Sequence, residues 1–385
     1  MSTTRTPLED NTTGVKGRLE HPGSLRQILV GVTGALLCTG VVMVASASSI
    51  YSFVNTGNTW SIAEKQLMFA VLGIFAMRWA SRLSEARMRQ IASVSIYGVL
   101  VALAAVLVIG VSVYGQKNWI AVGPFRLQPS EFAKLAMILW CADHFTKKDG
   151  KLHYRSELLY GYGIMSVVIL GLVLLEGDLG TAMVMMPIIA SMLFFVGAPM
   201  KWFGYLTAAC LAGIVFLSVI TPYRMARFAS WLNPSADEQG TGFQVIHGQR
   251  ALGSGGWFGV GLGASKEKWG TLPEAHTDFI YAVIGEEGGI VSTLLILVLF
   301  AAIVYVGLRI ARTSPSRFVQ LTSLGIVVWI ATQVMVNIGA VLGILPVTGV
   351  PLPLVSYGGS SLIPTLTALG ILLAFTKWHA QEAQQ

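Results

Sequence analysis

Long apolar segments separated by short polar stretches dominate this chain of 385 residues. They run roughly through residues 27–52, 62–80, 90–113, 130–146, 157–175, 179–199, 202–220, 278–308, 318–344 and 356–377. Most are long enough to cross a hydrocarbon core of about 30 Å, and a helix satisfies its own backbone hydrogen bonds in lipid. The sequence therefore predicts an all-α polytopic membrane protein with about ten transmembrane helices.

The composition agrees with a membrane protein and argues against other classes. Charged residues make up 12% of the chain, whereas a soluble domain carries roughly a quarter. The net charge of +7 is spread along the chain, so it indicates membrane topology rather than nucleic-acid binding. Cys38, Cys141 and Cys210 each lie in an apolar segment, which predicts small core residues rather than disulfides or metal ligands.

Lysine and arginine predict the orientation in the membrane. They collect in alternate connections, whereas the connections 53–61 and 345–355 contain none. With the positive-inside bias, both termini are cytosolic, which requires an even number of spans. We expect a cytosolic tail (1–25), a membrane domain (26–378) and a second cytosolic tail (379–385). The domain includes a large extracellular loop, 221–277, between the seventh and eighth spans.

Two outer segments carry positive charge against this bias. The residues concerned include Lys117 and Arg126 in 114–130, and Arg224, Arg227 and Lys268 in 221–277. One interpretation is that these charges are solvated or paired with acids of the same loop. The other is that they bind an anionic ligand at the outer face, such as a lipid phosphate.

Glycines mark two further places. The run 253–263 has a glycine at about every second position, which indicates either close backbone approach or a flexible re-entrant loop. It lacks the strand and the acidic residue of a dinucleotide fingerprint. Gly285, Gly288 and Gly289 in the eighth segment predict a bend or close packing there.

The stretch 272–280 closes the large loop and opens the eighth span. Asp278 lies at or next to the first turn of the predicted helix, where free backbone N–H groups and the helix dipole favour an ionised carboxylate. It is either an ordinary N-cap or a general base at the membrane surface, and the two roles are compatible. His247 and His276 are too isolated from cysteine and other histidines to predict zinc, so no metal ligands are assigned.

The approach to the fourth span is rich in polar residues. Ser130 is placed to be its N-cap. Glu131 and Lys134 are three residues apart on one helix face, so an ion pair is expected. Such a pair at the bilayer edge is costly unless it lines a wet cavity. Trp119 has the place of an interfacial anchor, and Arg126 can bind a phosphate in a bidentate manner.

Three polar features have simpler interpretations. Turn chemistry explains the Glu176-Gly177-Asp178 connection between the fifth and sixth spans. Gln333 and Asn337 are four residues apart in the ninth span, and buried amides commonly link transmembrane helices. The run 356–361, Ser-Tyr-Gly-Gly-Ser-Ser, forms with the prolines before it an uncharged, kinked outer re-entrance.

Three long motifs make the chain recognisable. They are the stretch 123–134 with Gln128-Pro129-Ser130-Glu131 and Lys134, the stretch Leu272 to Asp278, and Asn337-Ile338-Gly339 through Pro346 and Thr348-Gly349 to Ser360-Ser361. The chain resembles the SEDS family (shape, elongation, division and sporulation), the FtsW/RodA/SpoVE group, over essentially all of 27–377. The runs 44–49 and 343–351 are most like its division branch in actinobacteria. Asn118 departs from the family, since many relatives carry arginine there.

This resemblance implies a peptidoglycan glycosyltransferase acting in cell division. Such enzymes polymerise lipid II, a disaccharide-pentapeptide on undecaprenyl pyrophosphate, into glycan strands at the outer face of the membrane. Asp278 matches the family's essential acidic residue and general base. Arg126, Glu131 and Lys134 match polar positions of its outer cavity, and Trp119 matches its aromatic position. The expected substrate-binding residues are Lys117, Trp119, Arg126, Glu131, Lys134, Arg224, Arg227, Lys268, Glu274, His276, Gln333, Asn337 and Ser356.

The resemblance also implies partners and a location. The expected partners are a class B penicillin-binding protein, which supplies the transpeptidase, and other divisome membrane proteins, in the bacterial cytoplasmic membrane at the septum. No nucleic acid is expected, and a divalent cation, Mg²⁺ or Mn²⁺, is the one candidate cofactor. Three alternatives stay open: an elongation polymerase of the RodA type, a lipid II flippase served by Glu286 and Glu287 inside the eighth span, and a non-catalytic scaffold.

Overall fold

The computed structural model describes residues 22–113, 116–123, 125–147, 155–204, 206–208, 213, 231–233, 242–270 and 272–382. Its helices are α2 (Pro22–Thr56), α3 (Ser61–Ala80), α4 (Glu85–Ile109), α5 (Pro129–Lys147), α6 (Arg155–Leu175), α7 (Leu179–Val196), α10 (Phe243–Ser254), α11 (Ile280–Thr313), α12 (Arg317–Val341) and α13 (Gly359–Glu382). The strands are β1 (Val111–Val113), β2 (Gln116–Val122) and β3 (Phe125–Leu127).

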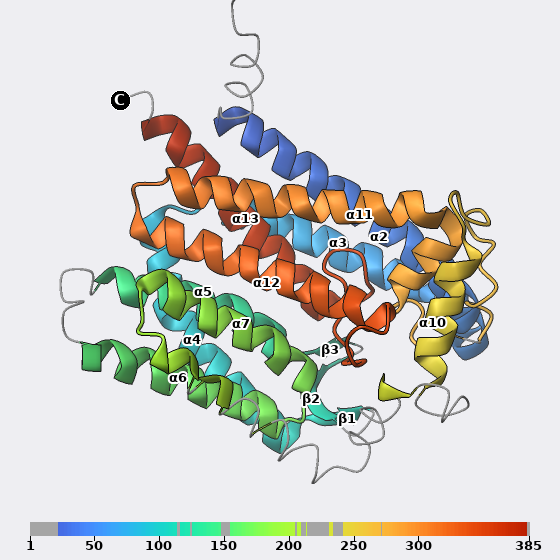
Figure 1. Ribbon diagram of the computed structural model, residues 1–385, viewed down its shortest axis with the longest axis horizontal. Helices are drawn as coiled ribbons and strands as arrows, with labels where there is room; N and C mark the ends of the chain where they lie inside the picture. The colour runs from blue at the N-terminus through green and yellow to red at the C-terminus, as the bar shows by residue number, and fades with distance from the viewer. Residues whose placement is uncertain are drawn as a thin grey trace, which may run out of the picture.

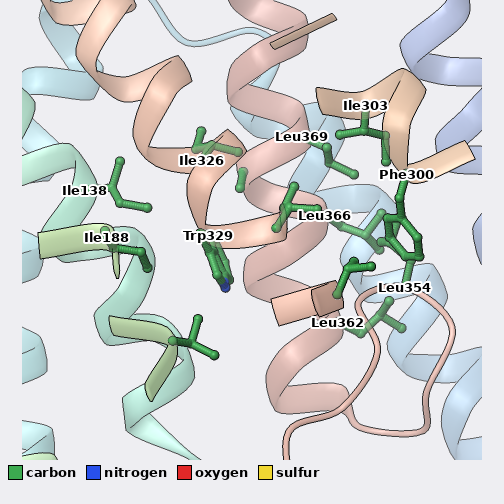
Figure 2. Packing of buried hydrophobic residues seen from close by; sticks show 14 of the residues in the cluster. Ile138, Ile188, Phe300, Ile303, Ile326, Trp329, Leu354, Leu362, Leu366 and Leu369 are labelled. Carbon is green, nitrogen blue, oxygen red and sulfur yellow. The ribbon is translucent and has the colours of Figure 1, made fainter. Parts of the chain in front are cut away.

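The long helices form a bundle around α12 and α13. Helix α13 packs against α3, α2 and α5, and α12 packs against α11, α7 and α5 (Figure 1). Trp329 of α12 is fully buried, and Figure 2 shows it between Ile138 and Ile188 on one side and Leu362 and Leu366 on the other. The apolar core therefore lies along α12 and α13.

Six helices within the described residues are long and apolar enough to cross a membrane. They lie in 23–56, 85–109, 179–196, 280–313, 317–341 and 359–378. The segments predicted at 62–80 and 130–146 are helical as α3 and α5, but both carry charged residues. A shorter apolar helix covers 161–175, and most of the predicted span 202–220 lies outside the described residues.

Of two details of the predicted architecture, the structure confirms one and contradicts the other. The bend in the eighth segment is confirmed, because Gly289 interrupts α11 with φ 68° and ψ −169°, a region open to glycine. The all-α prediction is wrong in 111–127, where β1, β2 and β3 form an antiparallel sheet in the order β1-β2-β3. Strands this short carry little periodicity for a sequence pattern to reveal.

The prediction that the cysteines are core residues is confirmed for one cysteine and wrong for another. Cys141 is buried, as expected of a core residue, and is a free thiol. Cys38 is exposed on α2, so its prediction as a core residue is wrong. Cys210 lies outside the described residues.

Candidate functional site

A cavity of about 720 Å³ opens at the end of the bundle that carries the small sheet. Its walls come from the α2–α3 turn, β2, β3, the first turns of α5 and α7, and the segments 273–278 and 348–361. The predicted site residues that line it are Trp119, Arg126, Glu131, Lys134, Glu274, His276 and Asp278. Segments far apart in the sequence thus bring half of the predicted residues to one place.

Asp278 lies just before α11 and is not its N-cap. The N-cap is Phe279, whose side chain makes no capping hydrogen bond, so the N-cap interpretation of Asp278 is wrong. A Cβ added to Gly349 would lie 3.5 Å from the Oδ2 atom of Asp278, so the carboxylate faces the 348–351 wall of the cavity. Glu274 opens the turn with φ 56°, a left-handed conformation that non-glycine residues rarely adopt.

Hydrogen bonds from behind the cavity hold the backbone that carries Asp278. Asn337 Nδ2 donates to the carbonyl oxygens of Asp278 and Val350, both at 2.8 Å. Ser356 Oγ donates to the Thr277 carbonyl at 2.6 Å. Asn337 and Ser356 are buried and are not among the lining residues. Asn337 therefore joins α12 to two non-helical segments instead of linking two helices as predicted. Asn337 and Ser356 both position the acid.

Glu131 and Lys134 form the predicted ion pair, with 2.8 Å between Oε1 and Nζ and both side chains buried. Lys134 Nζ also donates to Gln333 Oε1 at 3.1 Å, and Gln333 Nε2 donates to the Pro351 carbonyl at 2.9 Å. Glu131 Oε2 has no hydrogen-bond partner among the described residues. Glu131, a residue that lines the cavity, thus keeps one buried carboxylate oxygen without a partner in the described part of the chain.

Two cationic side chains of the cavity, unlike Lys134, have no ion-pair partner among the described residues. Arg126 and Lys65 are exposed, and neither side chain joins an ion pair or hydrogen bond within the described part of the chain. Sequence reasoning missed Lys65, because it falls inside a predicted span. Its place next to Glu64, in the first turn of that helix, was the available signal.

Asp178 is the second residue that sequence reasoning missed. It is the N-cap of α7, with its Oδ1 accepting from Thr181 N at 2.9 Å. Its Oδ2 accepts from Asn118 Nδ2, Gln128 Nε2, Ser130 Oγ and Thr181 Oγ1 at 3.3, 2.6, 3.1 and 2.8 Å. Ser130 therefore bonds Asp178 instead of capping α5. Asp178 itself lines the cavity and joins β2, α5 and α7 in its wall.

Glu176 lies in the turn before α7 and is buried. Neither of its carboxylate oxygens has a hydrogen-bond partner in the described part of the chain. Burial, with the nearby charge of Asp178, raises the pKa of Glu176 from 4.5 to about 8. The carboxyl is therefore protonated at neutral pH, and the turn holds one negative charge rather than two.

His276 is an aromatic element of the cavity wall. Its ring centroid lies 5.2 Å from that of Tyr51 and 5.7 Å from that of Tyr357. Burial lowers the pKa of His276, against an opposing effect of the Glu274 carboxylate. A neutral imidazole adds no positive charge beside Asp278.

Other predicted residues lie elsewhere. Lys117 Nζ donates to the carbonyls of Leu107 and Val108 at the end of α4, at 2.7 and 3.1 Å. Lys268 is buried and pairs with Glu287 at 3.0 Å. Neither lysine lines the cavity. Arg224 and Arg227 lie outside the described residues.

Comparison with known proteins identifies the family. The family model described as "Cell cycle protein", for the FtsW, RodA and SpoVE proteins, matches residues 26–381. Stage V sporulation protein E of Bacillus subtilis is 39% identical over 91% of this chain and 96% of its own length. A probable peptidoglycan glycosyltransferase FtsW of Mycobacterium tuberculosis is 36% identical over 98% of this chain and 75% of its own.

Solved structures agree with this match. A chain of a peptidoglycan synthase complex that coordinates polymerization and crosslinking superposes with a TM-score of 0.75 at 30% identity, covering 92% of this chain and 98% of that one. The rod shape determining protein RodA of Thermus thermophilus gives a TM-score of 0.68 at 28% identity, covering 91% and 95%. The described residues contain six apolar helices, and the chain belongs to the FtsW/RodA/SpoVE family of multi-pass membrane proteins.

Proposed function

We propose that this protein is a peptidoglycan glycosyltransferase that polymerises lipid II into glycan strands at the outer face of the cytoplasmic membrane. The observation that carries the proposal is the cavity, which gathers the carboxylate of Asp278 with the cations Lys65, Arg126 and Lys134. Relatives above a third identical are named for this activity. A carboxylate beside several cations suits a reaction that takes a proton from a sugar hydroxyl and releases a pyrophosphate.

The reaction follows from these groups. Asp278 accepts the proton of the acceptor sugar hydroxyl, whose oxygen forms the new bond to the anomeric carbon of the donor sugar. The bond from that carbon to the undecaprenyl pyrophosphate breaks, and its electron pair leaves with the pyrophosphate. Arg126 and Lys65 have no competing partner among the described residues, so they are available to bind the leaving phosphates. No nucleotide is required, since the donor is already activated.

A divalent cation, Mg²⁺ or Mn²⁺, is part of the proposal. Among the described residues no three histidine, cysteine, aspartate or glutamate side chains converge on one point, so this part of the chain holds no complete protein-only site. Mg²⁺ is commonly held by one or two carboxylates together with substrate phosphates. Asp278 and Glu131 both line the cavity and are carboxylates that fit this arrangement. The cation would neutralise charge on the leaving pyrophosphate.

The topology and setting are proposed with the activity. Ten spans with both termini in the cytosol leave the loop 221–277 and the cavity outside, with tails at 1–25 and 379–385 flanking a membrane domain at 26–378. The neighbouring synthase complex, which couples polymerization to crosslinking, supports a class B penicillin-binding protein as partner. Relatives of the FtsW type favour the septum and other divisome membrane proteins over the elongation role.

A lipid II flippase is the competing activity. It predicts polar residues that line a path through the thickness of the bundle. Glu286 and Glu287, its candidates, do not line the cavity. Glu287 pairs with Lys268, and Glu286 accepts a hydrogen bond from Ser265 Oγ at 2.5 Å. The polar groups that line the cavity collect instead at one end of the bundle, which favours surface chemistry.

One reconstitution separates the two activities. The protein is placed in vesicles with its class B partner, fluorescent lipid II in both leaflets and a divalent cation, and both polymer formation and lipid II transfer between leaflets are measured. We expect polymer from the wild type and none from Asp278→Ala. Transfer between leaflets without polymer, under every partnered condition, would replace the polymerase with the flippase.

A further inference from the structure

The backbone of the loop 255–269 packs closely against the kink of α11. Gly255 and Gly259 pass so close to the Gly285 and Glu287 carbonyls that a Cβ on either glycine would overlap them. Val260 N donates to the Glu286 carbonyl at 2.9 Å. The glycine-rich run is therefore a backbone in close approach, the first of its two predicted interpretations, rather than a flexible loop.

The same backbone completes the broken helix. Ile290 N donates to the Gly256 carbonyl at 2.9 Å, and Val291 N donates to the Trp257 carbonyl at 3.3 Å. These are N–H groups that the kink at Gly289 would otherwise leave without a helical partner. The loop thus occupies the position of the missing turn.

A buried charged cluster fixes the other end of the loop. Lys268 Nζ lies 3.0 Å from Glu287 Oε1, and the Lys266 backbone N–H donates to Glu286 Oε1 at 2.8 Å. Ser46 of α2 donates to Glu287 Oε1 at 2.8 Å. Buried charges with partners on three segments resist rearrangement, because each movement would leave one of them unpaired.

This rigid loop holds large apolar side chains away from the protein. Trp257, Phe258 and Leu262 are 69%, 83% and 76% exposed, and Trp269 is 70% exposed. The backbone contacts above fix the main chain that carries the first three of them. Large exposed apolar patches mark interaction surfaces, and tryptophan is enriched where a membrane meets water.

The exposed side chains continue a lipid-facing surface of α11. Directly beyond the kink, α11 exposes Ile290, Val291, Leu294, Leu295 and Val298. Ile290 and Val291 carry the N–H groups that bond the loop, so the loop lies against the outer end of this face. Figure 1 shows the loop 255–269 at the end of α11, beside α10. A helix face of this composition in a multi-pass membrane protein meets acyl chains.

We propose that residues 257–262 insert into the leaflet on the cavity side of the membrane, with Trp257, Phe258 and Leu262 among the acyl chains and Lys266 at the headgroups. The occupant of this surface is phospholipid. Because the Leu272 N–H bonds the Glu267 carbonyl at 2.9 Å, the insertion fixes the membrane depth of the segment that leads to Asp278. The proposal does not depend on the proposed activity.

Depth measurement by a spin label tests the proposal. The full chain, with its three native cysteines replaced by alanine, receives one nitroxide at Leu262→Cys and is placed in nanodiscs of phosphatidylethanolamine and phosphatidylglycerol. Leu295→Cys is the control in the hydrocarbon, and Ser84→Cys, exposed before α4, is the control in water. Collision rates with oxygen and with a water-soluble nickel complex are compared.

We expect the label at Leu262 to behave like the label at Leu295, with more oxygen and less nickel contact than at Ser84. Nickel contact equal to that at Ser84 would overturn the proposal. A label shielded from both reagents would also overturn it, because a second copy of the chain would then cover the loop.

A second measurement needs no cysteine replacement. Nanodiscs containing lipids brominated on the acyl chain quench tryptophans that touch them, and the wild type is compared with Trp257→Phe. We expect the substitution to remove part of the quenched fluorescence. Equal quenched fluorescence in the two proteins would contradict insertion of Trp257.

Discussion

The buried pair of Glu131 and Lys134 gives the sharpest prediction for stability. In Lys134→Met, Glu131 Oε1 loses its partner at 2.8 Å while Oε2 already has none among the described residues. Both side chains are almost fully buried, so the substitution leaves an isolated carboxylate. Breaking a buried pair in this way costs about 3–5 kcal/mol, and water in the cavity favours the lower end. We therefore expect a loss of about 3 kcal/mol in the free energy of unfolding.

The assay is equilibrium unfolding in mixed micelles with increasing denaturing detergent, followed by circular dichroism. The matched control is the double variant with Glu131→Gln and Lys134→Met, which removes the stranded charge. We expect this double variant to recover about 2 kcal/mol of the loss. A Lys134→Met protein as stable as the wild type, or a double variant no more stable than Lys134→Met, would refute the buried-pair account.

Three further predictions concern the surroundings of the cavity. Gly349→Ala should lower polymer yield more than Gly123→Ala. Both glycines have positive φ, 76° and 59°, but only the new Cβ at Gly349 would lie near Asp278, 3.5 Å from its Oδ2 atom, whereas nothing lies within 4 Å at Gly123. Equal yields from the two variants would contradict this prediction. Glu176 has a pKa of about 8 against an ordinary 4.5, so the folded state binds more protons in this window and stability falls as the pH rises through it. Thermal unfolding should show this fall in the wild type and not in Glu176→Gln, whereas parallel curves would argue against a protonated carboxyl. Gln333→Leu should cost about 1–3 kcal/mol in the same unfolding assay, because it removes the acceptor of the buried Trp329 indole N–H and the second acceptor of Lys134. Wild-type stability would show that these donors find other partners.

Features set by neighbouring residues in the chain could be predicted from the sequence. The pairing of Glu131 with Lys134 needs only their spacing of three on a helix. The bend of α11 needs only the glycines around Gly289, and the contact of Gln333 with Lys134 of α5 needs only a polar amide in an apolar helix. The structure confirmed each of these, because all the residues needed for the prediction lie within one helix.

Features set by distant segments could not be predicted. Asp178 accepts hydrogen bonds from β2, α5 and α7, which no local pattern relates to one another. Lys268 looked like an available outer cation, whereas its partner Glu287 lies in a helix whose kink was predicted but whose contacts were not. The capping role of Asp278 failed by a single residue, which is the usual uncertainty of a helix boundary.

Polymer synthesis by Asp278→Asn tests the central claim most directly. The variant keeps the shape of the side chain and removes its ability to accept a proton. With labelled lipid II, the class B partner and a divalent cation, gel analysis of the glycan products should show a loss of at least about 100-fold, as expected for a general base, with wild-type thermal stability. Glycan chains at wild-type yield from the same variant would contradict the assignment of Asp278 as the base.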